Sequence, residues 1–409
     1  MRRRDFLIRS GLGAAALALP LPGCAHRYGI RTGIIGVGNF GASDYHLGRW
    51  VDITQVIAVA DVDTAKLDAA TARSSRRSIA KYQDYRELIA RDDIDAVVVV
   101  TPDHWHVRPA IEAAESGKHV YCEKPLTLTI AEGKELREAV NRTGIVFQTG
   151  SEQRSYEEFH LACECVRNGR IGQLQRIEAS IYGSPATPFV PADPQPATLD
   201  WDMWLGQAPD VPYHQLRASP NFRHFRDYSG GTITDLGAHE LDIAQWGGGY
   251  DGTGPVSVSG TGTVPADDFF DTPTTFEVNY TYADGVTLRF YSSDEEWHVQ
   301  FFGSDGDIYV HRDLIRASRP EILDYKLGSG EVPLHYSRDH FTDWLDAIQN
   351  GIQPGCPVEV GHRSATLCHM ASIAIQTGRT LTWDPVTEEF VGDAAANALM
   401  TRPKRPPWG

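Results

Sequence analysis

The chain has no excess of positive charge. Its 38 Lys and Arg residues stand against 54 Asp and Glu residues, which leaves a net charge of −16 over 409 residues. Nucleic acids and anionic membranes attract proteins mainly through Lys and Arg. We therefore predict that the folded part binds neither of them, and that the acidic surface serves solubility.

Cysteine is also scarce, and its spacing is irregular. Apart from Cys24, five cysteines remain, an odd number without the spacing of a disulfide framework. Cys163 and Cys165 are too close together for the usual metal-binding pair. We therefore predict buried thiols, no structural disulfide and no metal site. The remaining cysteines are Cys122, Cys163, Cys165, Cys356 and Cys368.

Repeats and low-complexity segments are absent, and 38 Gly with 24 Pro predict no long disordered tract. The length predicts two domains. The N-terminus differs from the rest: Arg2-Arg3-Arg4-Asp5-Phe6-Leu7 precedes an apolar, Ala-rich run that ends near Pro22. That run is short for a permanent transmembrane helix. The arginines, with Phe6 and Leu7, resemble a twin-arginine export signal.

We therefore predict that residues 1–25 are an export signal and that the protein is exported to the periplasm. Two interpretations of the end of this signal stay open. Leu21-Pro22-Gly23-Cys24 resembles a lipoprotein box, which would place a lipid anchor on Cys24, whereas Gly23-Cys24-Ala25 also fits a small-residue cleavage site.

The segment 26–150 alternates between short apolar strands and helices, a pattern typical of a parallel, doubly wound α/β sheet. We predict a Rossmann domain here. Its expected strands are residues 30–36, 53–60, 96–100, 119–122 and 145–148, and its expected helices are residues 65–72, 85–90, 107–116 and 130–143.

The segment 151–409 predicts an α+β domain with an open antiparallel sheet. Ala283-Asp284-Gly285 has hairpin chemistry, and residues 184–230 read as loop. The expected strands are residues 173–182, 256–263, 274–282, 286–292 and 297–302; the expected helices are residues 157–168, 232–246, 338–350 and 361–377.

A glycine-rich run, Gly36-Val37-Gly38-Asn39-Phe40-Gly41, lies between the first predicted strand and a predicted helix. In a dinucleotide site Gly36 permits the tight turn, Gly38 lets the backbone approach the pyrophosphate, and Gly41 permits close helix–strand packing. Asp61 ends the second strand, where a carboxylate can bind the adenosine ribose hydroxyls and repel a 2′-phosphate. This favours NAD over NADP.

Two further groups suggest chemistry. Glu123-Lys124-Pro125 directly follows a strand, so Lys124 is expected near the nicotinamide, where it can stabilise a developing alkoxide. Asp235 and His239 are four residues apart on a predicted helix and therefore share one face. Taken alone, this pair could be base and orienting group, half a metal site, or a satisfied core histidine.

The whole sequence resembles the Gfo/Idh/MocA oxidoreductase family. The resemblance rests on the glycine run, on Thr101-Pro102-Asp103-His104-Trp105-His106, on Glu123-Lys124-Pro125 and on Asp235-x-x-x-His239. It implies that Lys124 and Asp235 are catalytic and that His239 accepts the proton of a substrate hydroxyl. It also implies sugar or polyol substrates and homodimers or homotetramers that pack through the open sheet.

The residues expected to bind the cofactor are Gly36, Gly38, Asn39, Phe40, Gly41, Asp61, Thr101, Pro102, His106, Glu123 and Lys124. Aromatic rings and multidentate donors suit carbohydrate faces and hydroxyls, so candidate substrate contacts are Trp105, Gln153, Arg154, Trp204, Arg223 and Tyr228.

Three functions follow as hypotheses. The first is NAD(P)-dependent hydride transfer from a sugar, polyol or glycoside hydroxyl, with a tightly bound cofactor because an exported protein meets no free NAD pool. The second is a glycosidase that oxidises, eliminates and re-reduces with bound NAD; exported relatives that do this lack the lysine retained here as Lys124. The third is an inactive sugar-binding or sensor protein.

Overall fold

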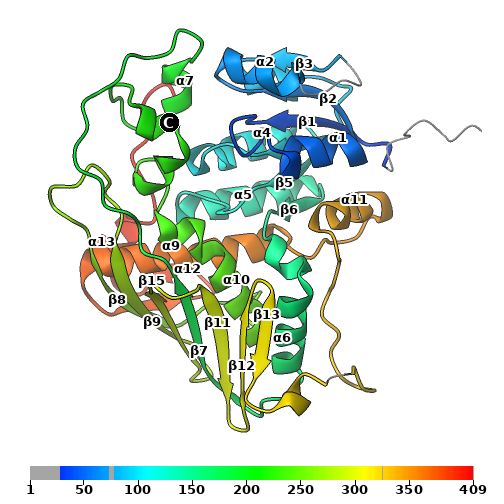
Figure 1. Cartoon of the computed structure of the whole chain (residues 1–409), viewed down its shortest axis with the longest axis vertical. Coiled ribbons are helices and arrows are strands. Elements are labelled where there is room, and N and C mark those ends of the chain that lie inside the picture. Colours follow the sequence, from blue (N-terminus) through cyan, green and yellow to red (C-terminus); the bar gives the residue numbers. More distant parts are fainter. Residues whose placement is uncertain (1–27, 73–77, 325, 409) are drawn as a thin grey trace, which may run out of the picture.

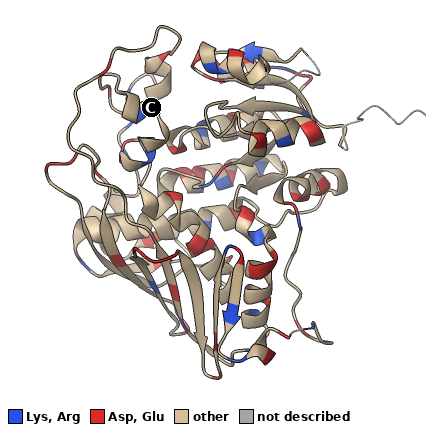
Figure 2. Ribbon diagram, viewed as in Figure 1, with Lys and Arg blue, Asp and Glu red and all other residues tan. Residues whose placement is uncertain are grey.

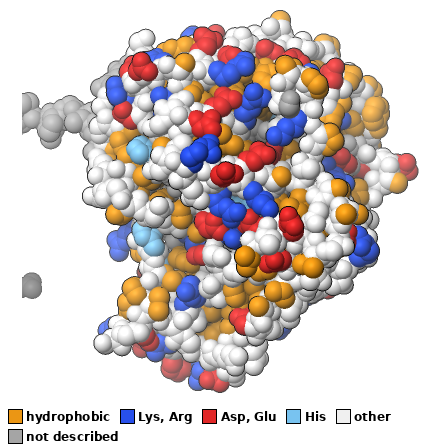
Figure 3. Space-filling model, turned by 180° about the vertical axis from the view of Figure 1, so that it is seen from behind, with side chains coloured by type: hydrophobic (Ala, Val, Ile, Leu, Met, Phe, Trp, Pro, Cys, Tyr) orange, Lys and Arg blue, Asp and Glu red, His pale blue; other side chains and the backbone are white. Residues whose placement is uncertain are grey.

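The computed structural model describes residues 28–72, 78–324 and 326–408 (Figure 1). The predicted export signal, residues 1–25, and Cys24 lie outside the described residues. Within those described ranges, no helix has the length and apolar character needed to cross a membrane. Basic and acidic residues are distributed over both parts of the molecule (Figure 2), and their side chains are interleaved on the rear face (Figure 3).

The first domain is a six-stranded parallel sheet with strand order β3-β2-β1-β4-β5-β6, which confirms the predicted Rossmann domain. The sequence analysis missed only the short strand β3. The strands are β1 Arg31–Ile35, β2 Gln55–Ala60, β3 Ala80–Tyr82, β4 Ala96–Val99, β5 His119–Cys122 and β6 Phe147–Thr149. The helices between them are α1 Arg49–Ile53, α2 Thr64–Ala72, α3 Tyr85–Ile89, α4 Val107–Glu115 and α5 Ile130–Thr143.

One face of this sheet is covered by a helix from the far end of the chain. The residues of α11 (His340–Asn350) belong to the segment predicted as the second domain, yet Phe341 and Trp344 pack against Trp50 and Tyr121 of the first. The four aromatic rings form one buried cluster. The boundary predicted at residue 150 therefore separates the two domains along the chain, but the core of the first domain also contains residues that come after it.

The second domain is built on a nine-stranded sheet of order β13-β12-β11-β7-β10-β9-β8-β14-β15. Its pairs are antiparallel except β7 with β10, which run parallel, so the sheet is mixed. The strands are β7 Leu174–Ile181, β8 Ser257–Thr263, β9 Thr275–Thr281, β10 Thr287–Ser292, β11 His298–Gly303, β12 Asp307–His311, β13 Leu314–Ala317, β14 Leu381–Asp384 and β15 Glu389–Phe390.

Three helices, α6 (Glu157–Arg167), α10 (Gly237–Gly248) and α12 (Val358–Thr377), cover one face of this sheet and form the largest hydrophobic core with it. No helix of the described ranges covers the opposite face (Figure 1). Buried and exposed side chains alternate along β9, which places Glu277 and Asn279 on this open face. The predicted open sheet is therefore present.

The helix expected over residues 232–246 is interrupted. It divides into α9 (Thr232–Asp235) and α10, with Leu236 between them. The backbone amide of His239 donates to the carbonyl of Leu236 at 3.0 Å, not to that of Asp235. The break therefore frees the Asp235 carbonyl oxygen for another donor.

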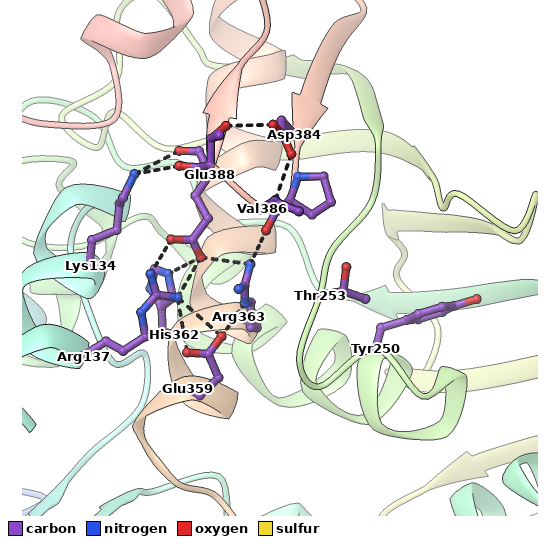
Figure 4. Close-up of polar contacts among 12 residues, drawn as sticks. Lys134, Arg137, Tyr250, Thr253, Glu359, His362, Arg363, Asp384, Val386 and Glu388 are labelled. Carbon is purple, nitrogen blue, oxygen red and sulfur yellow. Dashed lines mark hydrogen bonds and ion pairs between the residues drawn. The ribbon is translucent and has the colours of Figure 1, made fainter. Parts of the chain in front are cut away.

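A buried ionic network joins the C-terminal hairpin to both domains (Figure 4). Glu388, in the turn between β14 and β15, is 1% exposed. Its carboxylate lies 2.6 Å from Arg137 of α5 and 2.9 Å from both His362 and Arg363 of α12. One carboxylate thus links the nucleotide-domain helix α5 to the long helix of the second domain.

Candidate active site

A cavity of about 720 Å³ lies between the two domains. Its floor is the carboxyl edge of the parallel sheet, where ligands bind in doubly wound folds. Residues from the second domain, such as Asp235, Trp297 and Arg312, form the facing wall. All predicted catalytic residues and all predicted cofactor-binding residues line this cavity.

The glycine-rich loop has the geometry of a dinucleotide cradle. Gly36 has a φ of +90°, and a Cβ there would lie 2.6 Å from the Val100 carbonyl oxygen. A Cβ on Gly41 would collide with the Gly36 carbonyl oxygen, whereas a Cβ on Gly38 would meet only the Lys66 amine at 3.8 Å. The loop is therefore closed at Gly36 and Gly41 and open at Gly38, as backbone approach to a pyrophosphate requires.

The helix after this loop departs from the expected geometry. Residues 39–43 form turns, and the first helical segment, Asp44–Gly48, is a π-helix that leads into α1. Two of its aromatic residues are turned inward: Tyr45 lines the cavity, and the His46 imidazole lies 3.2 Å from the Glu123 carboxylate. Burial raises the pKa of Glu123, but the interactions with His46 and Lys124 outweigh it and lower that pKa.

Asp61 follows β2 directly and is fixed by two backbone amides. Its carboxylate accepts hydrogen bonds from Val37 at 2.9 Å and from Asp63 at 3.0 Å. The first of these bonds ties the ribose-binding position directly to the glycine loop. Lys66 of α2 also lines the cavity, and the sequence analysis did not select it.

Lys124 and Asp235 form an ion pair at the centre of the cavity. The Lys124 amine donates to the Asp235 carboxylate at 2.8 Å and to the freed Asp235 carbonyl at 2.9 Å. Arg223 lies 3.1 Å from the same carboxylate. Burial alone would lower the pKa of Lys124 and raise that of Asp235, but their mutual attraction reverses both shifts. Arg223 helps to lower the pKa of Asp235, and its charge opposes the rise in the pKa of Lys124. Lys124 is therefore cationic, and its third N–H remains for a ligand.

His239 lies beside this pair as a neutral imidazole. Burial lowers its pKa well below the ordinary value, and the charges of Lys124 and Arg312 lower it further against the opposing effect of Asp235. Its Nε2 is 3.4 Å from the Arg312 guanidinium. A neutral imidazole at neutral pH is the protonation state that a proton acceptor needs.

The remaining first-domain residues shape the cavity wall. Thr101 and Pro102 follow β4, and the His106 ring nitrogens lie 2.9 Å from the Thr101 carbonyl oxygen and 2.7 Å from that of Pro125. His106 therefore ties the loop after β4 to the loop that carries Lys124.

Three of the six candidate substrate contacts line the cavity: Trp105, Trp204 and Arg223. Trp105 is 7% exposed, and its indole N–H donates to the Trp204 carbonyl oxygen. Its ring packs edge-on against Trp408 near the C-terminus. Trp105 is therefore mainly a packing residue at the edge of the cavity.

The other three candidates are not at the cavity wall. Arg154 is buried in ion pairs with Asp242 and Asp251 at 2.7 Å. The Tyr228 hydroxyl accepts from Arg217. Gln153 stands one layer behind the wall, where its carbonyl oxygen accepts a hydrogen bond from Arg312 at 2.9 Å.

Several cavity residues escaped the sequence analysis. Arg312 belongs to the turn between β12 and β13, two strands that the sequence did not predict, and carries no signal of its own. Glu152 follows β6 by three residues, so the rule of the sheet's carboxyl edge could have found it. The missed polar and aromatic residues are Tyr45, Lys66, Gln83, Tyr85, Asp103, Glu152, Tyr156, Ser219, Phe222, Trp297 and Arg312.

Metal binding finds no support in the part of the chain that the structure describes. No group of three or more His, Cys, Asp or Glu side chains there could hold an ion. Asp235, half of the considered metal pair, is already occupied by Lys124 and Arg223.

Comparisons with known proteins agree with this geometry. The family model for the Gfo/Idh/MocA oxidoreductase NAD-binding Rossmann fold matches residues 30–151. The model for the C-terminal alpha/beta domain of the same oxidoreductase family matches residues 186–409.

Among curated proteins, a myo-inositol 2-dehydrogenase from Thermotoga maritima is 23% identical over 376 residues, which are 87% of this chain and 99% of that protein. A glycosyl hydrolase family 109 protein from Shewanella sp. (strain W3-18-1) is 34% identical over 158 residues, 37% of this chain and 34% of the relative. Two uncharacterized oxidoreductases, from Streptococcus pneumoniae and Rhizobium meliloti, are matched over only 50% and 36% of their own length.

Among solved structures, the WlbA dehydrogenase from Bordetella pertussis, in complex with NADH and UDP-GlcNAcA, has the same fold. Its TM-score is 0.67 at 18% identity, over 87% of this chain and 99% of that one. The first domain is thus an NAD-binding Rossmann domain, and the chain belongs to the Gfo/Idh/MocA oxidoreductase family.

Proposed function

We propose that this protein oxidises a hydroxyl group of a sugar, polyol or glycoside and transfers the hydride to NAD. The observation that carries the proposal is the convergence of Lys124, Asp235 and His239 in one cavity with the glycine-rich loop. Bound NAD would supply the hydride acceptor at the carboxyl edge of the sheet.

Different residues of the chain accept the proton and stabilise the developing charge. Neutral His239 accepts the proton of the substrate hydroxyl. Its buried position lowers the pKa of the imidazole, so the ring is unprotonated when the substrate binds and can take up that proton. The cationic Lys124 amine donates its free N–H to the same oxygen and stabilises the negative charge that develops there. Asp235 holds that amine in place through two acceptor atoms.

A preference for NAD over NADP would depend on Asp61. We expect Asp61→Asn to shift the ratio of kcat/KM values toward NADP by about tenfold, equivalent to about 1.4 kcal/mol. The change removes a negative charge beside the ribose and leaves Lys66 nearby. Asp63→Asn is the matched control, since Asp63 does not line the cavity, and it should leave the ratio unchanged. Equal ratios in both variants would contradict this role of Asp61.

Export, followed either by a lipid anchor at Cys24 or by cleavage at the small-residue site, and assembly into homodimers or homotetramers through the open sheet belong to the same proposal. The twin-arginine route carries folded proteins, so the cofactor could travel with the chain. The periplasm holds no free NAD pool, and a captive cofactor must be restored in place. The reaction would then be redox-neutral, with transfer between two sugars or transient oxidation.

The absorbance spectrum of the purified protein tests this function. We expect NAD(H) to remain after dialysis and the 340 nm band to rise or fall when a matching sugar or polyol is added. A panel of aldoses, polyols and glycosides that leaves the band unchanged, both within the first turnover and at steady state, would contradict hydride transfer. Loss of cofactor during dialysis would contradict only its tight retention.

The match to glycosyl hydrolase family 109 proteins favours a second candidate, glycoside cleavage by transient oxidation with bound NAD. Release of nitrophenol from aryl glycosides without added NAD would distinguish it from simple dehydrogenation. We rank it second because Lys124 is present in this chain.

A further inference from the structure

Glu152 is a buried carboxyl group that faces the cavity without a hydrogen-bond partner for one of its oxygens. It opens the short 3₁₀ segment Glu152–Ser155 directly after β6 and lines the cavity, yet it is only 9% exposed. Its Oε2 is buried and has no hydrogen-bond partner among the described residues. Buried polar atoms are nearly always hydrogen-bonded, so this oxygen indicates a missing ligand.

The neighbouring cations do not satisfy this carboxyl group. Lys124 already donates twice to Asp235, and Arg312 donates to Gln153. The Arg312 guanidinium is further fixed by stacking over Trp297, 4.7 Å from the ring centre. The charges of both side chains act on Glu152, but the hydrogen bonds that the Lys124 amine and the Arg312 guanidinium make go to other acceptors.

The second carboxyl group nearby, that of Glu123, bears on which ligand can bind to Glu152. Burial and the charge of Glu123 raise the pKa of Glu152 to about 7, against the opposing charges of Lys124 and Arg312. A second carboxylate brought to this point would meet Glu152 and Glu123 together. A neutral hydroxyl group meets no such repulsion and satisfies the free oxygen by donating to it.

The position of Glu152 relative to Lys124 further restricts the chemical class of the ligand. Lys124 and Glu152 both line the cavity, and the charge of each shifts the pKa of the other. A substrate whose hydroxyl meets the Lys124 amine would therefore present its next hydroxyl in the neighbourhood of Glu152. Compounds with hydroxyls on adjacent carbons fit both contacts at once.

We propose that Glu152 contacts the substrate directly, accepting a hydrogen bond from the hydroxyl next to the one oxidised, and that it thereby selects neutral polyols and sugars over sugar acids. This inference rests on the proposed function, because it assumes that the substrate lies against Lys124. It assigns Glu152 to specificity and leaves the proton and hydride steps to other groups.

Binding to the NADH-loaded protein tests the assignment without turnover. Quenching of NADH fluorescence would be titrated with myo-inositol, D-glucose and D-glucuronate in the wild type, Glu152→Gln and Glu152→Leu. We expect the wild type to prefer a neutral compound to D-glucuronate. Glu152→Leu should lower the affinity for that neutral compound at least tenfold, as expected for the loss of a hydrogen bond to a charged group. Glu152→Gln should lower this affinity less. The affinity for NADH itself should stay unchanged and reports intact folding.

Glu157→Gln is the matched control, because Glu157 is the exposed glutamate at the start of α6. Equal affinities in the wild type and Glu152→Leu for all three compounds, absence of binding in both included, would overturn the assignment. So would a wild-type preference for D-glucuronate that Glu152→Gln strengthens, since Arg312 would then be the group that selects the substrate. Failure of the proposed function is separate, because it appears as an unchanged 340 nm band in a protein that still binds sugar.

Discussion

Replacing Lys124 with methionine is expected to lower kcat by roughly 10³-fold, the loss typical of removing one donor to a developing oxyanion. Methionine has nearly the same length but no N–H and no charge. The substitution therefore leaves the substrate oxygen without its cationic donor, and it leaves Asp235 with Arg223 as its remaining ionic partner. Steady-state NADH formation with the best substrate measures the loss.

NADH binding separates a catalytic effect from a structural one. The glycine loop and Asp61 do not contact Lys124 through any hydrogen bond in the described part of the chain, so the NADH affinity should stay within about twofold, well below 1 kcal/mol. Lys326→Met, at an exposed lysine far along the chain, serves as the control. Near-normal turnover in Lys124→Met would remove Lys124 from the mechanism.

The second large effect concerns stability. We expect Glu388→Gln to lower the free energy of unfolding by about 3 kcal/mol, as for removal of one partner from a buried ion network. The neutral amide would leave Arg137, Arg363 and His362 without a carboxylate at the position where Glu388 now meets all three. Chemical denaturation of the purified protein measures the change.

The pH dependence of that change identifies its cause. Burial would raise the pKa of Glu388, but His362 and the arginines outweigh it and depress the pKa below its ordinary value. A carboxyl group with a depressed pKa stabilises the fold above its unfolded-state pKa, about 4.3, and this stabilisation disappears as the pH falls toward the folded-state value. The difference between the wild type and Glu388→Gln should therefore shrink below about pH 4.

Glu389→Gln provides the adjacent control, because Glu389 is exposed in the same hairpin. Its free energy of unfolding should equal that of the wild type at every pH. If the two variants lost the same stability, the network in Figure 4 would have no special part in joining the domains.

The parts of the site that the sequence predicted are those whose positions are determined by residues close to them in the sequence. A tight turn between strand and helix needs Gly36, and a residue that follows a parallel strand, such as Asp61 or Lys124, must lie at the carboxyl edge of the sheet. These positions follow from a few neighbouring residues, so the pattern alone located them. The pair Asp235–His239 was also found by spacing, although Leu236 breaks the helix that was expected to carry it.

The rest of the site depends on contacts distant in sequence. Arg312 reaches the cavity because β12 and β13 form the edge of the second sheet, and no residue near Arg312 indicates that placement. Gln153 and Arg154 were chosen as polar donors near the cavity, but their partners on α10 turn them away from it. Their neighbour Glu152 has no such partner and faces the cavity. Which of three adjacent polar residues faces the ligand was decided by residues of α10, far along the chain.

The packing of α11 against the first sheet affects how the protein folds during synthesis. Trp50 and Tyr121 acquire their cover only when Phe341 and Trp344 arrive. During synthesis the nucleotide domain therefore waits, with aromatic rings uncovered, until nearly the entire chain has left the ribosome. A fragment that ends after β6 would expose this cluster to water and aggregate. The NAD-binding domain is therefore among the first parts of the chain to be made and among the last to be completed.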